Sequence, residues 1–404
     1  MEKVTKKSLV FFITFLLIFL TFSPVINSKT FFYEPRNLNP SQKIRVIEAE
    51  SAYDYGYKVG EMFRLKFKIL DMILNFGFIF KNESEKNALT ESLKEIEQYS
   101  PFLFEELQGL SNATKIKIER ILFLSQTLFS NGGECTSSLS TGNATKNNET
   151  FVTFNVDSRT DSLYRFISVL SLRFYTYRLW VVNFSSLEYS YAFIGIPILY
   201  EFPMINEHGL SFAANGLHLS NKSVDTGSGI STSMLERLSM MTCKNVTEVA
   251  DVWLNSERAS GRNKIWPHFW DNSNSMWADA EGGILSIEQT HNNIITVFGN
   301  STEVTKAPEG ILWHANHHQW LKPDDTGSIH PEEYFSSAHR ENRIKELLIQ
   351  NYGNITLDVL KNIMRDHGGG SDPNKGDSYD ICRHSDENNS GVTDFSWIIE
   401  PKNT

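Results

Sequence analysis

The stretch Asn131-Gly-Gly-Glu-Cys-Thr-Ser-Ser-Leu-Ser140 divides the chain into two parts of different character. Its glycine pair is a strong break, because adjacent glycines are unfavourable inside helices and strands. Beyond the break the pattern becomes extended, and Cys135 stands at the head of the first predicted strand. Before the break, a strand is predicted at residues 44–50, followed by helices at residues 51–80, 86–99, 101–110 and 115–130.

Residues 135–404 are predicted to be rich in strands. Segments 136–140 and 151–156 form a predicted hairpin around the polar loop 141–150. Further strands are expected at residues 166–177, 179–184, 188–194, 209–214, 275–280, 284–289, 294–298 and 395–399, and helices at residues 232–243, 246–255, 336–350 and 357–365. The sequence therefore predicts an α+β fold with a helical amino-terminal segment. Within that segment, Gly56 and Gly60 are four residues apart and predict close packing of their helix on a neighbour.

The composition sets outer limits on function. The chain has 404 residues, of which 40% are hydrophobic, and this is enough for a large core. The formal net charge is -10, and the absence of a basic stripe in the sequence argues against a nucleic-acid partner. Three cysteines, Cys135, Cys243 and Cys382, do not form a disulfide framework. At least one thiol must then be free or paired between chains, and catalysis is one reason to keep it.

The first 28 residues have the pattern of a secretory signal peptide. Lys3, Lys6 and Lys7 precede an apolar run from Leu9 to Phe22, and small and polar residues follow. Retention as a membrane anchor is the alternative, since spanning helices need about 20 apolar residues. We favour cleavage, and so expect a secreted protein or one of a lysosome-like compartment, with membrane contact only if this segment is retained.

Ten glycosylation sequons support that expectation. An N-linked glycan requires Asn-X-Ser/Thr at the surface of a protein that passes through the secretory pathway. The asparagines are Asn82, Asn112, Asn143, Asn148, Asn183, Asn221, Asn245, Asn300, Asn354 and Asn388.

Cys135 becomes chemically distinctive if it lies at a chain terminus. A free α-amine titrates near 7.7–8.0, so it can accept the proton of the thiol on its own residue. Before any cut, the same sulfur can attack the carbonyl of Glu134, and water can then resolve the thioester. The ordinary alternative is that Cys135 is a small buried hydrophobic residue at the start of a strand.

The predicted return strand carries Asn155 and Asp157 on one face, because strand residues alternate. Pairing of the hairpin brings this face beside Cys135, where a carboxylate can hold the new α-ammonium group. The alternative is that Asn-X-Asp simply ends the strand.

Several motifs together resemble the acyl-coenzyme A:6-aminopenicillanic-acid acyltransferase family, also called peptidase family C45. In order, they are Tyr55-Gly-Tyr-Lys-Val-Gly60, Gly133-Glu-Cys-Thr-Ser137, Asn155-Val-Asp157, Ile205-Asn-Glu-His-Gly-Leu210 with Ala213-Ala-Asn-Gly216, His314-Ala-Asn-His317 and Ile381-Cys-Arg383. The resemblance covers most of residues 44–400 and implies the four-layer αββα sandwich of N-terminal-nucleophile hydrolases. It also implies self-cleavage between Glu134 and Cys135, giving chains 29–134 and 135–404 that stay together as a heterodimer.

The resemblance also implies roles for individual residues. Cys135 matches the nucleophile, and Asp157 matches the carboxylate that orients its α-amine. Asn316 matches a side-chain oxyanion donor, and Asn215 is a second candidate donor, although it is equally suited to a turn. Arg383 matches an arginine near the nucleophile. Glu134 departs from the family pattern, which has glycine before the cysteine, and this makes the rate of self-cleavage uncertain.

The predicted function is amide hydrolysis or acyl transfer through an acyl-thioester on Cys135, with a small-molecule amide or acyl substrate. Hydrolysis is favoured over transfer, because a secretory compartment offers no obvious acyl-coenzyme A. Two alternatives remain: a phospholipase B-like ester hydrolase and a secreted glycoprotein without catalysis. No cofactor is expected. His314, His317 and His318 do not suggest a metal site, because no carboxylate or cysteine completes a ligand spacing.

Overall fold

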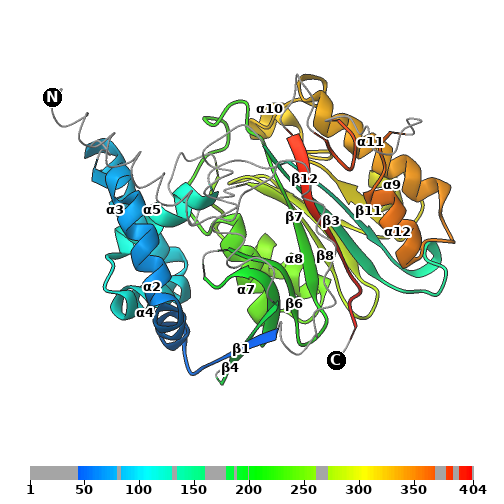
Figure 1. Ribbon diagram of the computed structural model, residues 1–404. Coiled ribbons are helices and arrows are strands. Elements are labelled where there is room, and N and C mark those ends of the chain that lie inside the picture. Colours follow the sequence, from blue (N-terminus) through cyan, green and yellow to red (C-terminus); the bar gives the residue numbers. More distant parts are fainter. Residues whose placement is uncertain are drawn as a thin grey trace, which may run out of the picture. The chain divides into compact units, whose positions relative to one another are not determined.

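The computed structural model describes residues 44–79, 83–129, 134–159, 179–185, 189–198, 200–260, 272–368, 379–384 and 391–402. The predicted signal peptide, the glycine pair before Glu134 and the predicted strand 166–177 lie outside these residues. The described residues form a mixed α/β structure with two β-sheets (Figure 1). This confirms the coarse prediction of a mixed α/β chain with a helical start.

The larger sheet has eight strands in the order β1-β4-β5-β6-β7-β8-β9-β10. Its first pair, β1 with β4, is parallel, and its other pairs are antiparallel. The strands are β1 (Ile44–Ala49), β4 (Leu179–Phe184), β5 (Tyr191–Ile196), β6 (Tyr200–Asn206), β7 (Ser211–Gly216), β8 (Ser273–Ala278), β9 (Ile284–Gln289) and β10 (Ile294–Phe298).

The smaller sheet is antiparallel and contains the predicted hairpin at its centre. Its order is β11-β2-β3-β12, formed by Ile311–His314, Cys135–Ser140, Phe151–Arg159 and Gly391–Ile399. Cys135 is opposite Val156 in the β2–β3 register, which confirms the predicted hairpin. A short 3-10 turn, η2 (Gly142–Ala144), lies in the connecting loop.

Apolar side chains join the faces of the two sheets, where β2 and β3 contact β7 and β8. Cys135, Leu139 and Phe154 of the smaller sheet share one buried cluster with Ala213 and Met276 of the larger sheet. Helices α11 (Phe335–Gln350) and α12 (Leu357–Met364) contact the smaller sheet, and α7 (Thr232–Thr242) and α8 (Val246–Leu254) contact the larger sheet. Short helices α9 (Thr302–Thr305), α10 (Pro323–Thr326) and η4 (Pro331–Glu333) lie in the connections.

Among the residues described before Cys135 there are four helices: α2 (Ala52–Ile79), α3 (Glu83–Tyr99), α4 (Pro101–Thr114) and α5 (Ile118–Phe129). Helix α2 packs closely on α4, which confirms the close packing predicted from Gly56 and Gly60. A Cβ atom added at Gly56 would collide with the backbone of Glu106, and one at Gly60 would collide with Ala113. The close approach of these helices therefore requires residues without a side chain at both positions.

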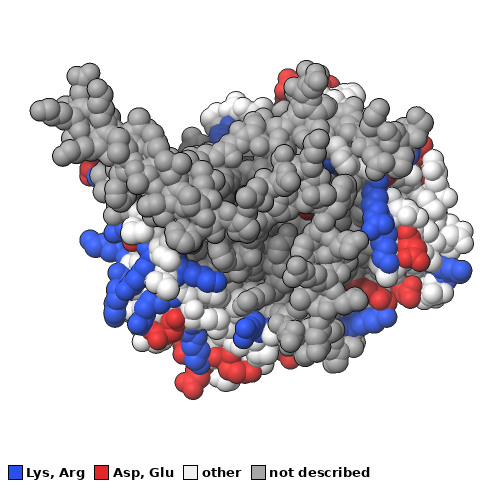
Figure 2. Space-filling view, viewed as in Figure 1, with Lys and Arg blue, Asp and Glu red and all other residues white. Residues whose placement is uncertain are grey.

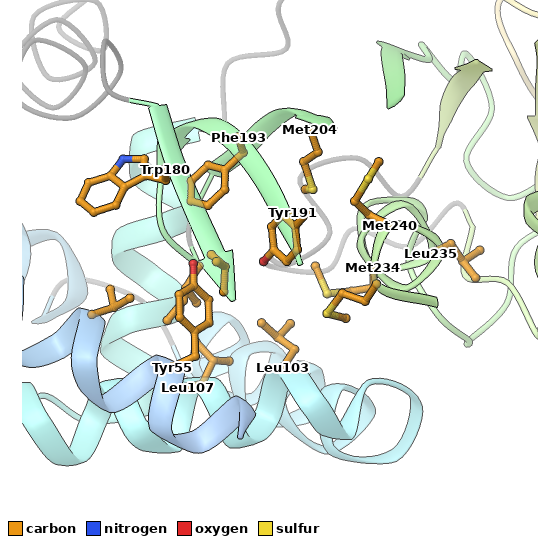
Figure 3. Packing of buried hydrophobic residues seen from close by; sticks show 14 of the residues in the cluster. Tyr55, Leu103, Leu107, Trp180, Tyr191, Phe193, Met204, Met234, Leu235 and Met240 are labelled. Atoms are coloured by element: carbon orange, nitrogen blue, oxygen red, sulfur yellow. The ribbon is translucent and has the colours of Figure 1, made fainter. Parts of the chain in front are cut away.

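A continuous apolar core joins these helices to the strand-rich part of the chain. Tyr55 of α2 and Leu107 of α4 lie near Tyr191 and Phe193 of β5, with methionines of α7 beside them (Figure 3). Burial of this apolar surface is the dominant stabilising term in the fold.

A buried ionic network crosses the same boundary. Arg237 of α7 donates two hydrogen bonds to the carboxylate of Glu106, at 2.7 and 2.8 Å. It also lies 3.1 Å from a carboxylate oxygen of Glu201, which accepts hydrogen bonds from Tyr55 and Tyr191 at 2.7 Å. Segments on both sides of Cys135 are therefore held by paired buried charges, whose separation would leave an uncompensated ion.

Two strands of the structure were not predicted from the sequence. Strand β6 contains Pro203, which removes a backbone donor and weakens the strand pattern. Strand β11 has four residues, too few for an alternating pattern to emerge. Most other predicted elements agree with the structure to within a few residues.

On the face in Figure 2, described basic and acidic side chains are interspersed. The described residues include no helix that is both long and apolar enough to span a bilayer.

Glu236 on α7 predicts a pH dependence of stability. Burial raises its pKa to about 8, against the opposite effect of hydrogen bonds from Ser273 and Ser275. The pKa of Glu236 is higher in the folded state than in the unfolded state. The contribution of this carboxyl group to the free energy of unfolding is therefore greatest at low pH and is lost as the pH rises toward 8. We expect Glu236→Gln to lose less stability than the wild type between pH 5 and pH 8. The difference is at most about 1.4 kcal/mol per pH unit.

Thermal-unfolding midpoints at the two pH values measure this effect. Glu303→Gln is the control, since Glu303 is almost fully exposed. Equal pH slopes for wild type and Glu236→Gln would contradict the assignment.

Candidate active site around Cys135

The peptide bond between Glu134 and Cys135 is held at both ends. The backbone N–H of Asp157 donates to the carbonyl oxygen of Glu134 at 2.8 Å. The backbone N–H of Cys135 donates to Oδ1 of Asn316 at 2.9 Å. A hydrogen-bond donor therefore already contacts the carbonyl oxygen of Glu134. Negative charge would develop on this oxygen if the sulfur attacked the carbonyl carbon.

The thiol of Cys135 is buried, which favours its protonated form. Burial raises its pKa to about 12, and the charge of Asp157 acts in the same direction. Backbone hydrogen bonds from Gly216 and Asp157 and the charge of Arg340 favour the thiolate and oppose this shift. The sulfur therefore needs a nearby base before it can act as a nucleophile.

Asp157 is a buried carboxylate that could serve this purpose. It is opposite Thr393 of β12, whose hydroxyl donates to Oδ1 at 2.7 Å. Its Oδ2 has no hydrogen-bond partner and lies 3.8 Å from the guanidinium of Arg383. Burial raises the pKa of Asp157 to about 7, while Arg340 and Arg383 oppose the shift. An aspartate of this kind can exchange a proton near neutral pH.

Glu134 is held firmly by cations. Its Oε2 accepts from Ser336 at 2.7 Å and from Arg340 at 2.7 Å, and it lies 2.9 Å from Arg383. The hydroxyl of Tyr334 is also hydrogen-bonded to this carboxyl group. Although burial acts in the opposite direction, the two arginines lower the pKa of Glu134 to about 2. We call the four residues around this carboxylate (Tyr334, Ser336, Arg340 and Arg383) the Glu134 clamp.

Arg340 connects most of the site, and the sequence analysis missed it. It is fully buried on α11 and donates to the carbonyl oxygen of Cys135, to Thr136 Oγ1 at 2.8 Å and to Asn316 Oδ1 at 2.8 Å. A signal was present in the sequence, because Arg340 lies four residues after Ser336 and four before Ile344, on one helical face that is buried. An arginine on a buried face needs anionic or carbonyl partners.

The guanidinium of Arg383 lies 2.9 Å from the carboxylate of Glu134, the residue before Cys135, and 3.8 Å from that of Asp157. Gly391 makes room for it, since a Cβ atom there would collide with the guanidinium. The backbone N–H of Arg383 donates to Thr393 Oγ1 at 2.8 Å, so Thr393 positions both Arg383 and Asp157.

Asn316 and Asn215 are both fully buried, but their contacts differ. Asn316 presents its oxygen to Cys135 and Arg340, while its Nδ2 donates to the Gly216 carbonyl at 2.8 Å. Asn215 accepts from Ser137 at 2.5 Å and donates to the His314 carbonyl at 3.3 Å. The hydrogen bond on the Glu134 carbonyl thus comes from the Asp157 backbone, and oxyanion roles for both asparagines stay predictions.

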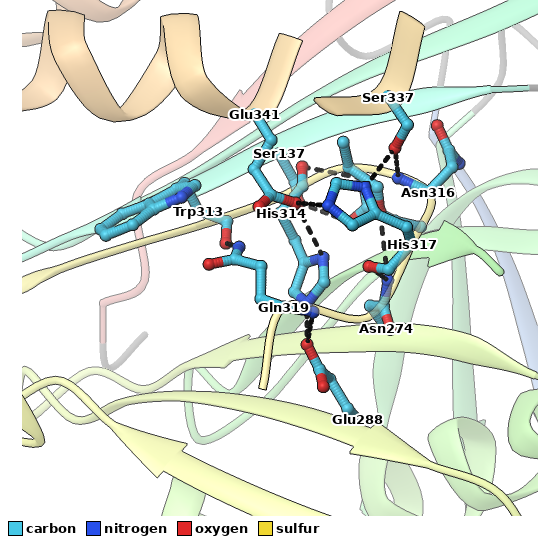
Figure 4. Close-up of polar contacts among 12 residues, drawn as sticks. Ser137, Asn274, Glu288, Trp313, His314, Asn316, His317, Gln319, Ser337 and Glu341 are labelled. Carbon is cyan, nitrogen blue, oxygen red and sulfur yellow. Dashed lines mark hydrogen bonds and ion pairs between the residues drawn. The ribbon is translucent and has the colours of Figure 1, made fainter. Parts of the chain in front are cut away.

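A buried histidine cluster lies behind Asn316 (Figure 4). His314 Nε2 is 2.9 Å from Glu288, and His317 Nε2 is 3.4 Å from Glu341. Ser337 links the cluster to the site, because its hydroxyl accepts from the Asn316 backbone at 2.7 Å and bonds to His317 at 2.8 Å. Carboxylates from distant segments therefore accompany these histidines, which the sequence spacing did not reveal.

In the described part of the chain, one group of side chains has the geometry to hold a metal ion. Ligand atoms of His367, Cys382 and His384 all lie within 4.8 Å of one another. Two imidazoles and a thiol are ligands that suit zinc. Burial raises the pKa of Cys382 to about 11, so a metal would have to displace this proton.

The other predicted features are placed as follows. Cys135, Cys243 and Cys382 are all free thiols. Of the sequon asparagines, Asn82 and Asn388 lie outside the described residues. None of the others is buried: Asn112, Asn143, Asn148, Asn183, Asn221, Asn245, Asn300 and Asn354.

The chain belongs to the acyl-coenzyme A:6-aminopenicillanic acid acyl-transferase family, whose model matches residues 144–380. This confirms the family predicted from the motifs. Asp157, Asn215, Asn316 and Arg340 lie inside the match, while Cys135 and Arg383 lie just outside it. No curated protein matches the sequence.

Two solved structures are similar to this chain at low identity. One is a mutant of conjugated bile acid hydrolase from Clostridium perfringens, with 14% identity and a TM-score of 0.38 over 66% of this chain and 86% of that chain. The other is penicillin V acylase from Agrobacterium tumefaciens, with 14% identity and a TM-score of 0.38 over 66% of this chain and 80% of that chain.

We expect the Glu134 clamp to affect the rate of the predicted self-cleavage before Cys135. Glu134→Gln keeps the shape of the side chain but removes the charge between Arg340 and Arg383, so the scissile carbonyl loses its anchor. We expect processing to slow by about tenfold, as one charge-assisted contact is worth about 1.5–3 kcal/mol. A time course of the uncut band measures the rate.

Glu346→Gln provides the matched control, because Glu346 also pairs with an arginine of α11 but on the surface. Processing of Glu134→Gln at the wild-type rate would show that the clamp has no part in the reaction.

Proposed function

We propose that the protein is a cysteine amidohydrolase of the N-terminal-nucleophile type, activated when the chain cuts itself between Glu134 and Cys135. The observation that carries this proposal is the geometry of that peptide bond. Its carbonyl accepts a hydrogen bond at 2.8 Å, its N–H donates one at 2.9 Å, and the sulfur and a carboxyl group with a pKa of about 7 lie beside it.

Activation starts with transfer of the thiol proton to Asp157. The sulfur attacks the Glu134 carbonyl carbon, and the developing oxyanion is held by the Asp157 backbone N–H. The C–N bond then breaks, the Cys135 nitrogen takes up a proton and leaves as the α-amine, and Glu134 remains on the sulfur as a thioester. Water hydrolyses the thioester, which frees the thiol and gives Glu134 a carboxyl terminus.

The mature enzyme uses the new α-amine as its base. Oδ2 of Asp157, which accepts no hydrogen bond, and Oδ1 of Asn316 are acceptors for the α-ammonium group that forms when the amine takes the thiol proton. The thiolate attacks the substrate carbonyl, the ammonium returns its proton to the leaving amine, and water releases the acid. Water as acceptor gives hydrolysis, which we favour, while an amine as acceptor gives transfer.

The wider organisation proposed for the mature enzyme rests on the contacts already described. Helices against the outer side of each sheet and strand-to-strand contact between the sheets support a four-layer αββα arrangement. The Glu106–Arg237–Glu201 network and the shared core support fragments 29–134 and 135–404 remaining together after the cut. The sequon positions support glycosylation and a secretory or lysosome-like location.

Chemistry at the new amino terminus tests this proposal. A terminal cysteine is a 1,2-aminothiol, which condenses with an aldehyde to a thiazolidine, whereas internal cysteines do not. We expect the 135–404 fragment alone to gain the mass of the aldehyde less one water, with parallel loss of hydrolysis of N-acyl amides. An adduct on no fragment, or unchanged amide hydrolysis after full modification, would contradict the proposal. Phospholipid hydrolysis by the same preparation would instead favour the ester-hydrolase alternative.

A further inference from the structure

We propose that the acyl group of the substrate carries a carboxylate, and that the Glu134 clamp binds it. The inference rests on the proposed function and names the substrate class of that same site. In self-cleavage the enzyme's first acyl group is Glu134 itself, because its carbonyl is the one transferred to sulfur. The surroundings of the Glu134 side chain are therefore the surroundings of an acyl chain on Cys135.

Those surroundings are built for an anion. Ser336, Arg340 and Arg383 converge on Oε2 of Glu134 within 2.7–2.9 Å. Arg340 is 0% exposed and Arg383 is 4% exposed, so neither guanidinium has bulk water to compensate it if the carboxylate leaves. Arg340 also donates to Cys135 and Asn316, and Arg383 lies beside Asp157. Both arginines must therefore stay in place during turnover.

The charge balance changes when Glu134 departs. In the uncut chain, Arg340 and Arg383 are balanced by Glu134 and Asp157. Hydrolysis of the first thioester gives Glu134 a second carboxylate near Asp157, whose pKa already responds to the charge of Glu134. Repulsion favours its departure, and an uncompensated buried cation then remains. An acyl group with its own carboxylate restores the balance, whereas a neutral acyl chain leaves the cation unpaired.

The side chain of Glu134 also sets the length of the acyl group. Four bonds separate the reacting carbonyl carbon from the carboxylate carbon in glutamate. Glutaryl groups have the same separation, and so do γ-glutamyl groups, whose α-carboxylate is four bonds from the acylating carbon. The clamp thus fits a five-carbon acyl group with a terminal carboxylate, and the amine that leaves is not constrained by these contacts.

Paired chromogenic substrates test this inference on the processed wild-type protein. Glutaryl and γ-glutamyl p-nitroanilides carry the carboxylate, and pentanoyl p-nitroanilide is the matched neutral substrate with the same carbon chain. We expect kcat/KM to be at least about 100-fold higher for the better of the two acidic substrates, since two charge-assisted contacts are gained. The ratio of acidic to neutral substrate cancels any difference in the amount of active enzyme.

Two variants locate the effect. Ser336→Ala removes one donor to the bound carboxylate, and we expect the ratio to fall about tenfold. Arg343→Gln removes a neighbouring arginine of α11 that pairs with Asp366, and we expect the ratio to be unchanged.

The outcomes separate this inference from the proposed function. A processed enzyme that hydrolyses the pentanoyl substrate at least as fast overturns the inference and leaves the proposed function intact. A ratio that Ser336→Ala does not alter also overturns it. A protein cut at Cys135 that hydrolyses neither acidic anilide overturns the inference, whereas a well-folded protein that stays uncut contradicts the proposed function.

Discussion

Replacement of Arg340 by methionine is expected to abolish self-cleavage and to destabilise the fold. The guanidinium bonds to Glu134, Thr136, Asn316 and the carbonyl of Cys135, and methionine supplies similar bulk without any donor. Removal of one partner of a buried ion pair costs about 3–5 kcal/mol. We expect a lower thermal-unfolding midpoint and processing slowed by at least about 1000-fold, as measured by the intact mass of the product.

Arg340→Lys separates the charge from the geometry. Lysine keeps the cation but has only three donors, and so cannot replace all four contacts of the guanidinium. We therefore expect Arg340→Lys to recover much of the lost stability and little of the processing. Full processing by Arg340→Met would show that Arg340 serves only to fill space.

Replacement of Asp157 by asparagine is expected to remove the base for activation. The two side chains have the same shape, and Thr393 can still bond to the remaining oxygen. Because burial raises the pKa of Asp157 to about 7, the ionised fraction of the wild type grows as the pH rises from 5 to 7. Wild-type self-cleavage should accelerate over that range, and Asp157→Asn should be at least about 100-fold slower with a flat pH profile.

The control for Asp157 is Thr393→Val, which removes the hydrogen bond to the carboxylate without removing its charge. Loss of a donor that favours the charged form raises the pKa further. The pH profile of Thr393→Val should therefore shift to higher pH, while an unshifted profile would point to a different base.

The sequence predicted the core of the site through short-range rules. The glycine pair and the alternation of strand residues placed Cys135 opposite the segment that carries Asp157, and the observed register agrees. The family motifs identified Asn316 and Arg383, which the structure brings to Glu134 and Cys135. Each of these predictions needs only local pattern or a motif in the right order.

The remaining features depend on contacts between distant segments. Arg340 is 205 residues from Cys135, and nothing local to α11 shows which acceptors its guanidinium meets. The same holds for Glu288 and Glu341 beside the histidines, and for Thr393 beside Asp157. Glu134 is the clearest case. In the sequence, a charged residue before Cys135 leaves the rate of the predicted self-cleavage open, whereas in the structure the clamp compensates this charge and lowers the pKa of Glu134 to about 2.

The most direct test of the account is the mass of the purified chain. Intact-mass analysis after deglycosylation, with amino-terminal sequencing of the larger fragment, should show two polypeptides for the wild type, the larger beginning Cys-Thr-Ser-Ser-Leu. Cys135→Ala should give one chain of unchanged fold. A well-folded wild-type protein that stays uncut, or a Cys135→Ala protein cut at the same bond, would contradict activation by Cys135.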